Sequence, residues 1–319
     1  MTRLPAFSGA TGWLNSRPLM AEDLHGKVVL ADFCTYTCIN WLRTLPYVRA
    51  WAEKYAGQGL VVIGVHTPEF PFEHEIDRVR QALREMRVDY PVALDNDYAV
   101  WEAFDNHYWP AVYIADAGGR IRHHHFGEGG YEECEQVIKK LLREAGAGGI
   151  DDELVSAVPD GFEAQADWNT LGSPETYLGY TQGRNFAGDS RAAFDEPHTY
   201  AAPEFLELNN WALSGEWTIE SGATVSNAAG GRLSFRFHGR DVNLVLAPPA
   251  GGAPVRFRVT IDGEAPGDAH GVDADERGDG AIVESRMYQL VRQPGPIADR
   301  TFEITFLDPG AHGYVFTFG

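Results

Sequence analysis

Two patterns of apolar and polar residues follow one another along the chain, and the change falls near residue 146. In the first part, short apolar runs alternate with stretches in which apolar residues recur at helical spacing. The runs predict strands at residues 27–33, 60–65, 91–95, 111–116 and 120–126. The helical spacing predicts helices at residues 42–55, 72–87, 98–104 and 132–144. This order predicts an α/β sandwich with one mixed sheet flanked by helices.

The second part of the chain has short strand patterns without helical spacing. Residues 147–172 are rich in Gly, Ala and acidic residues and are interpreted as a linker. Strands are then predicted at residues 217–220, 232–237, 241–246, 255–261, 287–292, 301–306 and 314–318. Such spacing is typical of an all-β sandwich or jelly roll. The predicted organisation is therefore an α/β domain at 1–146, the linker at 147–172 and a β-sandwich at 173–319, while residues 10–25 are expected to form a hairpin or loop before the first core strand.

The charge and composition of the chain limit which classes of molecule it can bind. The formal net charge is −20, and it is −5 over residues 1–150 and −15 over the rest. An acidic surface repels phosphate backbones, which excludes nucleic acid as a partner; solubility or a salt-adapted host explains the charge. No apolar run approaches the roughly 20 residues of a membrane span. The first 16 residues have no continuous apolar core of the kind a secretory signal needs, so the chain as written is expected to be soluble and cytoplasmic.

The cysteines point to redox chemistry. Three cysteines are too few for a disulfide scaffold, but Cys34 and Cys38 are only four residues apart. Cys38 lies between the strand at 27–33 and the helix at 42–55. The N–H groups and dipole at a helix start favour an anion, which lowers a thiol pKa and makes the reactive thiolate. Cys38 is therefore the candidate nucleophile.

Three further features make this region resemble the thioredoxin superfamily. Pro46 follows Cys38 by eight residues, Trp109-Pro110 directly precedes the strand at 111–116, and Asp32 lies six residues before Cys38. The resemblance implies that a cis-proline at Pro110 faces Cys38 and that the backbone around it holds the substrate. It also implies that Asp32 is a buried carboxylate that moves protons for the cysteines.

A closer resemblance is to the TlpA/ResA-type redoxins, and among them to the DipZ-like proteins. It is carried by residues 35–40, 43–48, 62–70, 90–96, 108–111 and 126–129. In DipZ-like proteins this domain precedes a carbohydrate-binding-module-like β-sandwich, which residues 173–179 and 314–319 resemble. The resemblance implies a possible carbohydrate ligand for the second domain. Relatives of the first domain are often extracytoplasmic, and no counterpart of the membrane-spanning electron-import part of the DipZ-like proteins is expected in the chain as written.

The sequence departs from this family at two positions. The family has tryptophan four residues before the nucleophile and a resolving cysteine three after it, whereas here Cys34 and Trp41 occupy those positions. If the two residues have exchanged places, total core volume is kept and Cys34 resolves Cys38. This requires Cα atoms within roughly 4.4–6.8 Å of each other. Alternatively, Cys38 acts alone with an external thiol, or the fold persists as a non-catalytic binding protein.

The first reading is a thiol–disulfide oxidoreductase that needs no cofactor. Cys38 attacks a protein or small-molecule disulfide, Cys34 releases the product and Asp32 exchanges the proton. Trp109, Pro110, Trp41 and Thr35 are the expected substrate-binding residues. Thr35 also gives a T-x-x-C pattern that resembles peroxiredoxins, but the proline that this family has seven residues before its cysteine is Ala31 here. A one-cysteine thiol peroxidase is the second candidate.

Other reactive residues have simpler interpretations. His123, His124 and His125 have no ligand partner at metal-site spacing, so no metal is expected. His66 and Glu69 lie at the end of a predicted strand. They either line a ligand-binding edge of the sheet or belong to an ordinary turn. Cys134 is expected to be a small buried residue. Five large side chains of the second domain either line a sugar site or, as is more common, fill the core. They are Tyr177, Trp211, Trp217, His238 and Tyr288.

Overall fold

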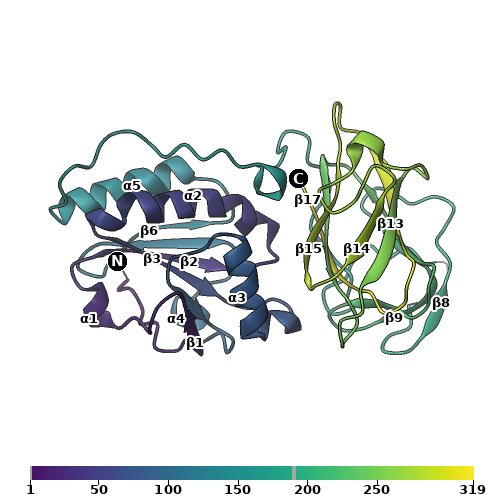
Figure 1. The fold of residues 1–319 in the computed structure, drawn as a ribbon, viewed down its shortest axis with the longest axis horizontal. Coiled ribbons are helices and arrows are strands. Elements are labelled where there is room, and N and C mark those ends of the chain that lie inside the picture. Colours follow the sequence, from purple (N-terminus) through teal and green to yellow (C-terminus); the bar gives the residue numbers. More distant parts are fainter. Residues whose placement is uncertain (1, 189–191) are drawn as a thin grey trace. The chain divides into compact units, whose positions relative to one another are not determined.

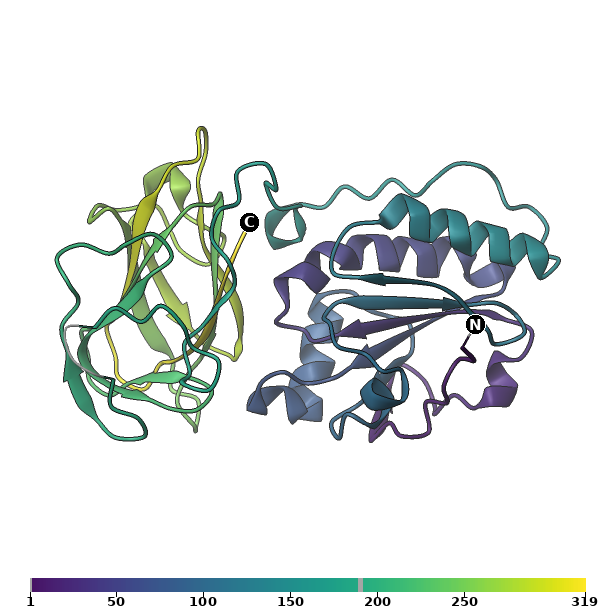
Figure 2. The ribbon, with the colours of Figure 1, turned by 180° about the vertical axis from the view of Figure 1, so that it is seen from behind.

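The computed structural model describes residues 2–188 and 192–319. The chain separates into two compact units, Met1–Ala164 and Gln165–Gly319 (Figures 1 and 2). In the first unit the sheet order is β1-β4-β3-β2-β5-β6, with β2, β3 and β4 parallel and the remaining pairs antiparallel. The second unit is all β. The α/β sandwich followed by an all-β domain is therefore confirmed.

The first unit contains five α-helices and six strands in its described residues. The strands are β1 (Gly12–Leu14), β2 (Val28–Cys34), β3 (Leu60–His66), β4 (Val92–Leu94), β5 (Ala111–Ala115) and β6 (Ile121–Phe126). The helices are α1 (Ala21–Leu24), α2 (Ile39–Tyr55), α3 (Ile76–Glu85), α4 (Ala99–Ala103) and α5 (Tyr131–Glu144). Helices α2 and α5 lie along one face of the sheet (Figure 1).

The alternation of side chains along β2 positions the site. Val29, Ala31 and Phe33 point into an apolar core that also contains Val100 of α4. Because successive strand residues point to opposite faces, Asp32 and Cys34 project from the other face, the one that α2 covers (Figure 1). A buried acid and a buried thiol therefore share the side of the sheet on which Cys38 begins its helix.

Two expected elements differ in the structure. Residues 10–25 do not form a hairpin, because β1 pairs with β4 and residues 21–24 form a single helical turn. The helix expected at 72–87 is divided into the 3-10 helix η2 (Pro71–His74) and α3. Glu75 separates them with an extended backbone, φ −78° and ψ 105°, which an uninterrupted α-helix cannot accommodate.

The chain after α5 packs back onto the first unit. Glu135 accepts hydrogen bonds from the backbone N–H of Val155 at 3.0 Å and from Trp51 Nε1 at 3.1 Å. Glu163, in the 3-10 helix η3 (Gly161–Glu163), forms an ion pair of 2.8 Å with Arg49 of α2. Residues 155–163 therefore lie along α2 rather than extending away from it.

The second unit is one curled antiparallel sheet around a large apolar core. Its strands are β7 (Thr176–Tyr177), β8 (His198–Tyr200), β9 (Trp211–Ile219), β10 (Thr224–Ser226), β11 (Gly231–Phe237), β12 (Asp241–Ala247), β13 (Val255–Ile261), β14 (Asp279–Ile282), β15 (Arg286–Arg292), β16 (Arg300–Phe306) and β17 (His312–Phe318). The order is β14-β13-β16-β11-β9-β10-β17-β12-β15, with β7 beside β17 and β8 beside β9. The predicted strands recur here, with β9 longer than expected.

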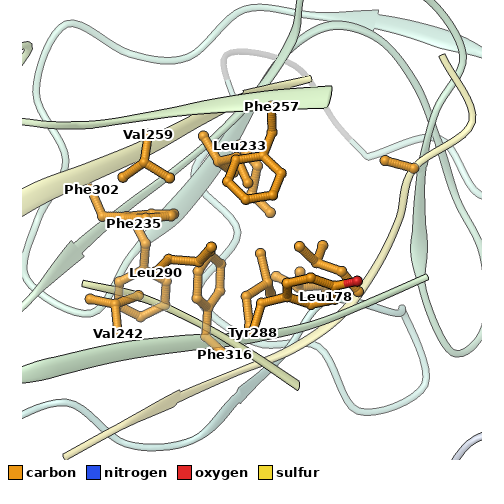
Figure 3. Close-up of a cluster of buried hydrophobic side chains, with 14 of the residues drawn as sticks. Leu178, Leu233, Phe235, Val242, Phe257, Val259, Tyr288, Leu290, Phe302 and Phe316 are labelled. Carbon is orange, nitrogen blue, oxygen red and sulfur yellow. The ribbon is translucent and has the colours of Figure 1, made fainter. Parts of the chain in front are cut away.

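Aromatic rings fill the core of this second unit. Phe235 and Phe316 lie with ring centroids 5.0 Å apart, and Phe302 packs against Phe316 at 5.7 Å (Figure 3). The same core contains three residues named above as candidates for a sugar site, namely Trp211, Trp217 and Tyr288. Because their rings are at most 2% exposed, they cannot stack on a sugar, and their role is core packing.

Among the described residues, no helix is long and apolar enough to cross a membrane.

Candidate functional site

Cys38 begins helix α2. A hydrogen bond of 3.1 Å from the Cys38 N–H to the Thr35 carbonyl closes a turn directly after β2. Cys38 is the N-cap residue, with extended backbone angles, and its own carbonyl accepts the first helical bond, from Leu42, at 2.9 Å. The thiol is partly exposed. The strand-to-helix junction inferred from the sequence is therefore present, and Cys38 is the residue at the helix end that favours an anion, although its side chain makes no capping hydrogen bond.

Trp109 and Pro110 lie beside Cys38. The Trp109–Pro110 peptide bond is cis, as the thioredoxin resemblance implies. Cys38 Sγ lies 3.8 Å from the Trp109 carbonyl oxygen, within hydrogen-bond range for sulfur. The Trp109 ring packs against Trp101 with centroids 4.3 Å apart, which fixes the loop that carries this carbonyl. Residues 71 positions apart in the sequence thus meet at one point of the surface.

Cys34 is buried at the end of β2. It is 1% exposed, and its Sγ lies 3.5 Å from the carbonyl oxygen of Val65. Neither Cys34 nor Cys38 is part of a disulfide. Burial raises the pKa of the Cys34 thiol well above its ordinary value, and the charges of Asp32, Cys38 and Glu73 add to the increase. Cys34 therefore stays protonated until a nearby base removes its proton.

Asp32 is fully buried beneath the cysteines. Its Oδ2 accepts hydrogen bonds from Trp41 Nε1 at 3.0 Å and from the Tyr90 hydroxyl at 3.4 Å. Burial raises the pKa of Asp32 to about 7, although both hydrogen bonds favour the anion. Such a carboxyl group can gain or lose a proton near neutral pH, which suits proton transfer.

Trp41 and Thr35 do not occupy the positions expected of substrate-binding residues. Trp41 is 1% exposed and Thr35 is fully buried, so neither side chain can touch a substrate. The indole of Trp41 points inward to Asp32. The sequence pattern does not distinguish a residue of the first helical turn that faces inward from one that faces outward.

Glu73 is a site residue that the sequence reasoning missed. It is fully buried and accepts hydrogen bonds from Thr37 Oγ1 at 2.7 Å and from the N–H groups of Glu69 and Phe70 at 2.7 and 2.9 Å. Burial raises its pKa, against these hydrogen bonds. A glutamate three residues after Phe70, with Pro71 between them, is the sequence signal of such a cap.

His66 lies next to Cys34 in the parallel pairing of β2 and β3. It is fully buried, and its ring stacks on Tyr36 with centroids 5.8 Å apart. Burial lowers the pKa of His66 to about 3, so the imidazole is neutral at physiological pH. Neither ring nitrogen has a hydrogen-bond partner in the described part of the chain. His66 therefore belongs to the buried face of the site, and Glu69 donates its backbone N–H to Glu73.

A second cysteine–histidine contact joins α5 to β6. Cys134 Sγ is 3.6 Å from His123 Nε2, and Glu133 Oε1 is 4.0 Å from His123 Nδ1. Burial raises the pKa of Cys134 to about 12, and the thiol is 2% exposed. This thiol is therefore unreactive at neutral pH. Within residues 2–188 and 192–319, no group of three or more His, Cys, Asp or Glu side chains is arranged to hold a metal ion.

Comparison with known families divides the chain as its fold does. The model of the AhpC/TSA family matches residues 2–124, and that of the thioredoxin-like C-terminal domain matches residues 173–319. Protein DipZ of Mycobacterium tuberculosis is 37% identical over 246 residues, which make up 76% of this chain and 34% of DipZ. The chain thus spans about a third of the length of that relative.

Shorter relatives match the first unit. The thiol-disulfide oxidoreductase YkuV of Bacillus subtilis is 28% identical over 141 residues, 44% of this chain and 95% of YkuV. The solution structure of a thioredoxin-like protein in the oxidized form is 29% identical and covers 44% of this chain and 95% of that one, with a TM-score of 0.41. The chain thus combines an AhpC/TSA-family domain with a thioredoxin-like C-terminal domain, and its relatives support a redoxin of the TlpA/ResA type.

Proposed function

We propose that this protein is a thiol–disulfide oxidoreductase in which Cys38 is the nucleophile and Cys34 the resolving cysteine. One observation carries the proposal: the partly exposed Cys38 is the N-cap of α2, and its Sγ lies 3.8 Å from the Trp109 carbonyl that precedes cis-Pro110. The helix start favours the thiolate. The backbone beside Pro110 is then the surface along which a substrate chain carries its disulfide to the sulfur.

The turn between β2 and α2 supports Cys34 as the resolving cysteine. A hydrogen bond between residues three apart keeps the Cα atoms of Thr35 and Cys38 within about 7 Å. This folds the chain back directly after Cys34, instead of extending it. The charge of Cys38 also contributes to the raised pKa of the Cys34 thiol, after burial and Asp32, which supports a resolving role for Cys34.

The reaction transfers two electrons to the substrate. Cys38 thiolate attacks one sulfur of a protein or small-molecule disulfide, and the other sulfur leaves as a thiolate that takes a proton from water. Cys34 then gives up its proton and attacks Cys38, the mixed disulfide breaks, and the second substrate thiolate leaves. An external dithiol reduces the Cys34–Cys38 disulfide and completes the cycle.

Two other functions remain candidates. In a single-thiol cycle, Cys38 acts with an external thiol and Cys34 is not required. In a binding protein, neither cysteine is required for function. A peroxidase of the T-x-x-C type is less well supported, because its threonine hydroxyl must reach the peroxide and Thr35 is fully buried.

Insulin reduction by the full chain, with dithiothreitol as the external dithiol, tests the proposal. We expect activity in the wild type and in Cys134→Ser, and its loss in Cys38→Ser. Cys34→Ser should accumulate a mixed disulfide on Cys38, visible by mass spectrometry as a mass increase removed by reductant. Activity retained in Cys34→Ser supports the single-thiol cycle instead. An inactive wild type supports a binding protein.

A further inference from the structure

Asp32 is held asymmetrically. Both of its hydrogen-bond donors, Trp41 and Tyr90, bind Oδ2, at 3.0 and 3.4 Å. Oδ1 is buried and has no hydrogen-bond partner among the residues that the structure describes. Buried polar atoms without partners are rare in folded proteins because they lose their hydrogen bonds to water. An unpaired carboxyl oxygen in the strand that also carries Cys34 therefore calls for a functional explanation.

The two donors reach Asp32 from opposite parts of the first unit. Trp41 lies in the first turn of α2, and Tyr90 lies just before β4. Gly64, which pairs with Asp32 across β2 and β3, leaves room for the second donor: a Cβ at this glycine would lie 3.3 Å from Tyr90 Cε2 and 3.1 Å from Val92 Cγ2. The Tyr90 hydroxyl stays protonated, because burial and then the charge of Asp32 raise its pKa.

Cys34 is the group that shares this face with Asp32. The two are alternate residues of β2, so their side chains project in the same direction. The charge of Asp32 contributes to the raised pKa of the Cys34 thiol, second only to burial. The Asp32 carboxyl and the Cys34 thiol, whose Sγ lies 3.5 Å from the Val65 carbonyl oxygen, therefore project from the same buried face of the sheet.

We propose that Trp41 and Tyr90 are positioning residues for Asp32, which fix Oδ2 so that Oδ1 takes the proton of Cys34. The inference rests on the proposed function, since it concerns its second step. In that step the Cys34 proton moves to Oδ1, the Cys34 sulfur bonds to Cys38 sulfur, and the bond between Cys38 and the substrate sulfur breaks. The substrate leaves with the electron pair. Trp41 stands where the family has its resolving cysteine, and its indole N–H instead orients Asp32, the base.

The other charged groups near Asp32 determine whether a second group changes its protonation in the same pH range. The titratable and charged groups that face it or its partners are Cys34 of β2, Cys38 and Arg49 of α2, His66 of β3, Glu73 of η2 and Tyr90. His66 is neutral above about pH 3, and Tyr90 remains protonated. Glu73 is the remaining buried acid, and its oxygens are bonded to Thr37 and to the backbone of η2.

The test removes each donor but keeps an aromatic ring at its position. In Trp41→Phe and Tyr90→Phe, the pKa of Asp32 is measured on the full chain by carbon-13 NMR of the carboxyl groups. Because each hydrogen bond favours the anion, we expect the pKa of Asp32 to rise by about one unit in each variant. Trp51→Phe is the matched control, since its indole N–H binds the buried carboxylate of Glu135 at 3.1 Å from the same helix, and it should leave Asp32 unchanged.

The second readout is the rate at which a preformed mixed disulfide on Cys38 releases its substrate thiol. With less Asp32 ionised, this rate should fall about fivefold at pH 7 in Trp41→Phe and recover above pH 9. An unshifted Asp32 pKa in both folded variants overturns the positioning role. A shifted pKa with an unchanged rate profile overturns the proton transfer. If the wild type forms no mixed disulfide at all, the proposed function fails, whereas the NMR titration still decides whether Trp41 and Tyr90 control Asp32.

Discussion

Arg43 of α2 and Glu128 of the loop after β6 form an ion pair of 3.5 Å, with side chains only 1% and 6% exposed. Removing one partner of a buried pair leaves an uncompensated charge. We therefore expect Arg43→Met to lower the free energy of unfolding by about 3–5 kcal/mol. The exposed pair Arg78–Glu75 is the control, and Arg78→Ala should cost less than about 1 kcal/mol.

Urea unfolding followed by circular dichroism at 222 nm measures both Arg43→Met and Arg78→Ala. All five α-helices of the described residues lie in the first unit, so this signal reports the unit that contains both pairs. Equal costs for the two substitutions would contradict the importance of burial for the Arg43–Glu128 pair.

Exchanging Cys34 and Trp41 tests whether the two positions compensate one another. Cys34→Trp alone forces a large ring into a buried position, and Trp41→Cys alone leaves a cavity and removes the hydrogen bond to Asp32. Each single variant should be destabilised by about 3 kcal/mol or more. The double variant should recover at least about 1 kcal/mol of the summed loss, because the exchange restores the total side-chain volume beneath α2.

The double-mutant cycle is measured by the same unfolding experiment. The exchanged chain has the cysteine order of the family, so we also expect a disulfide between Cys38 and the introduced cysteine, detected by mass spectrometry after oxidation. Strict additivity of the two single costs would mean that the positions are independent.

Thiol exposure predicts the order of alkylation. Cys38 is partly exposed, whereas Cys34 and Cys134 are 1% and 2% exposed. Burial also raises the pKa of both buried thiols, which leaves them without reactive thiolate at pH 7.5. Native protein treated with iodoacetamide should therefore be modified at Cys38 alone, and all three cysteines should react in 6 M guanidinium chloride. Native labelling of Cys34 at the rate of Cys38 would show that β2 opens readily.

Asp32 makes the stability of the protein depend on pH. Its pKa is about 7 in the fold, above the unfolded value of roughly 3.9. Below about pH 4 the Asp32 carboxyl is protonated in both the folded and the unfolded chain. As the pH rises from there through 7, the unfolded chain loses this proton before the folded chain does, so the free energy of unfolding falls. We expect Asp32→Asn to match the wild type within about 1 kcal/mol at pH 4 and to exceed it by about 2–4 kcal/mol at pH 8.

Denaturant unfolding at the two pH values measures this difference. The shifts of His66 and Glu73 are common to both proteins and cancel in the comparison. Asp77→Asn is the control, since its side chain is 88% exposed, and it should show no pH-dependent gain. A constant difference between Asp32→Asn and the wild type at both pH values would contradict ionisation of Asp32 near neutral pH.

The sequence predicted the main elements of both units well where local signals agree. Gly26 and Gly59 bound the apolar runs that became β2 and β3, and strand β13 has the predicted bounds, Val255–Ile261. The short strands β7, β8 and β10 were missed, because two or three residues carry no periodic pattern. They form only through partners already fixed elsewhere, as β10 does between β9 and β17.

By itself, the sequence determined which stretches are strands and helices and that Cys38 stands at a helix start, because these follow from periodicity and from neighbours in the chain. Only the tertiary structure decided that Trp41 turns inward to Asp32, that Tyr90 reaches the same oxygen from 58 residues away and that Glu73 is buried beside Thr37. Burial and hydrogen-bond partners depend on which distant segments pack together. They therefore decide pKa values and roles that no local pattern records.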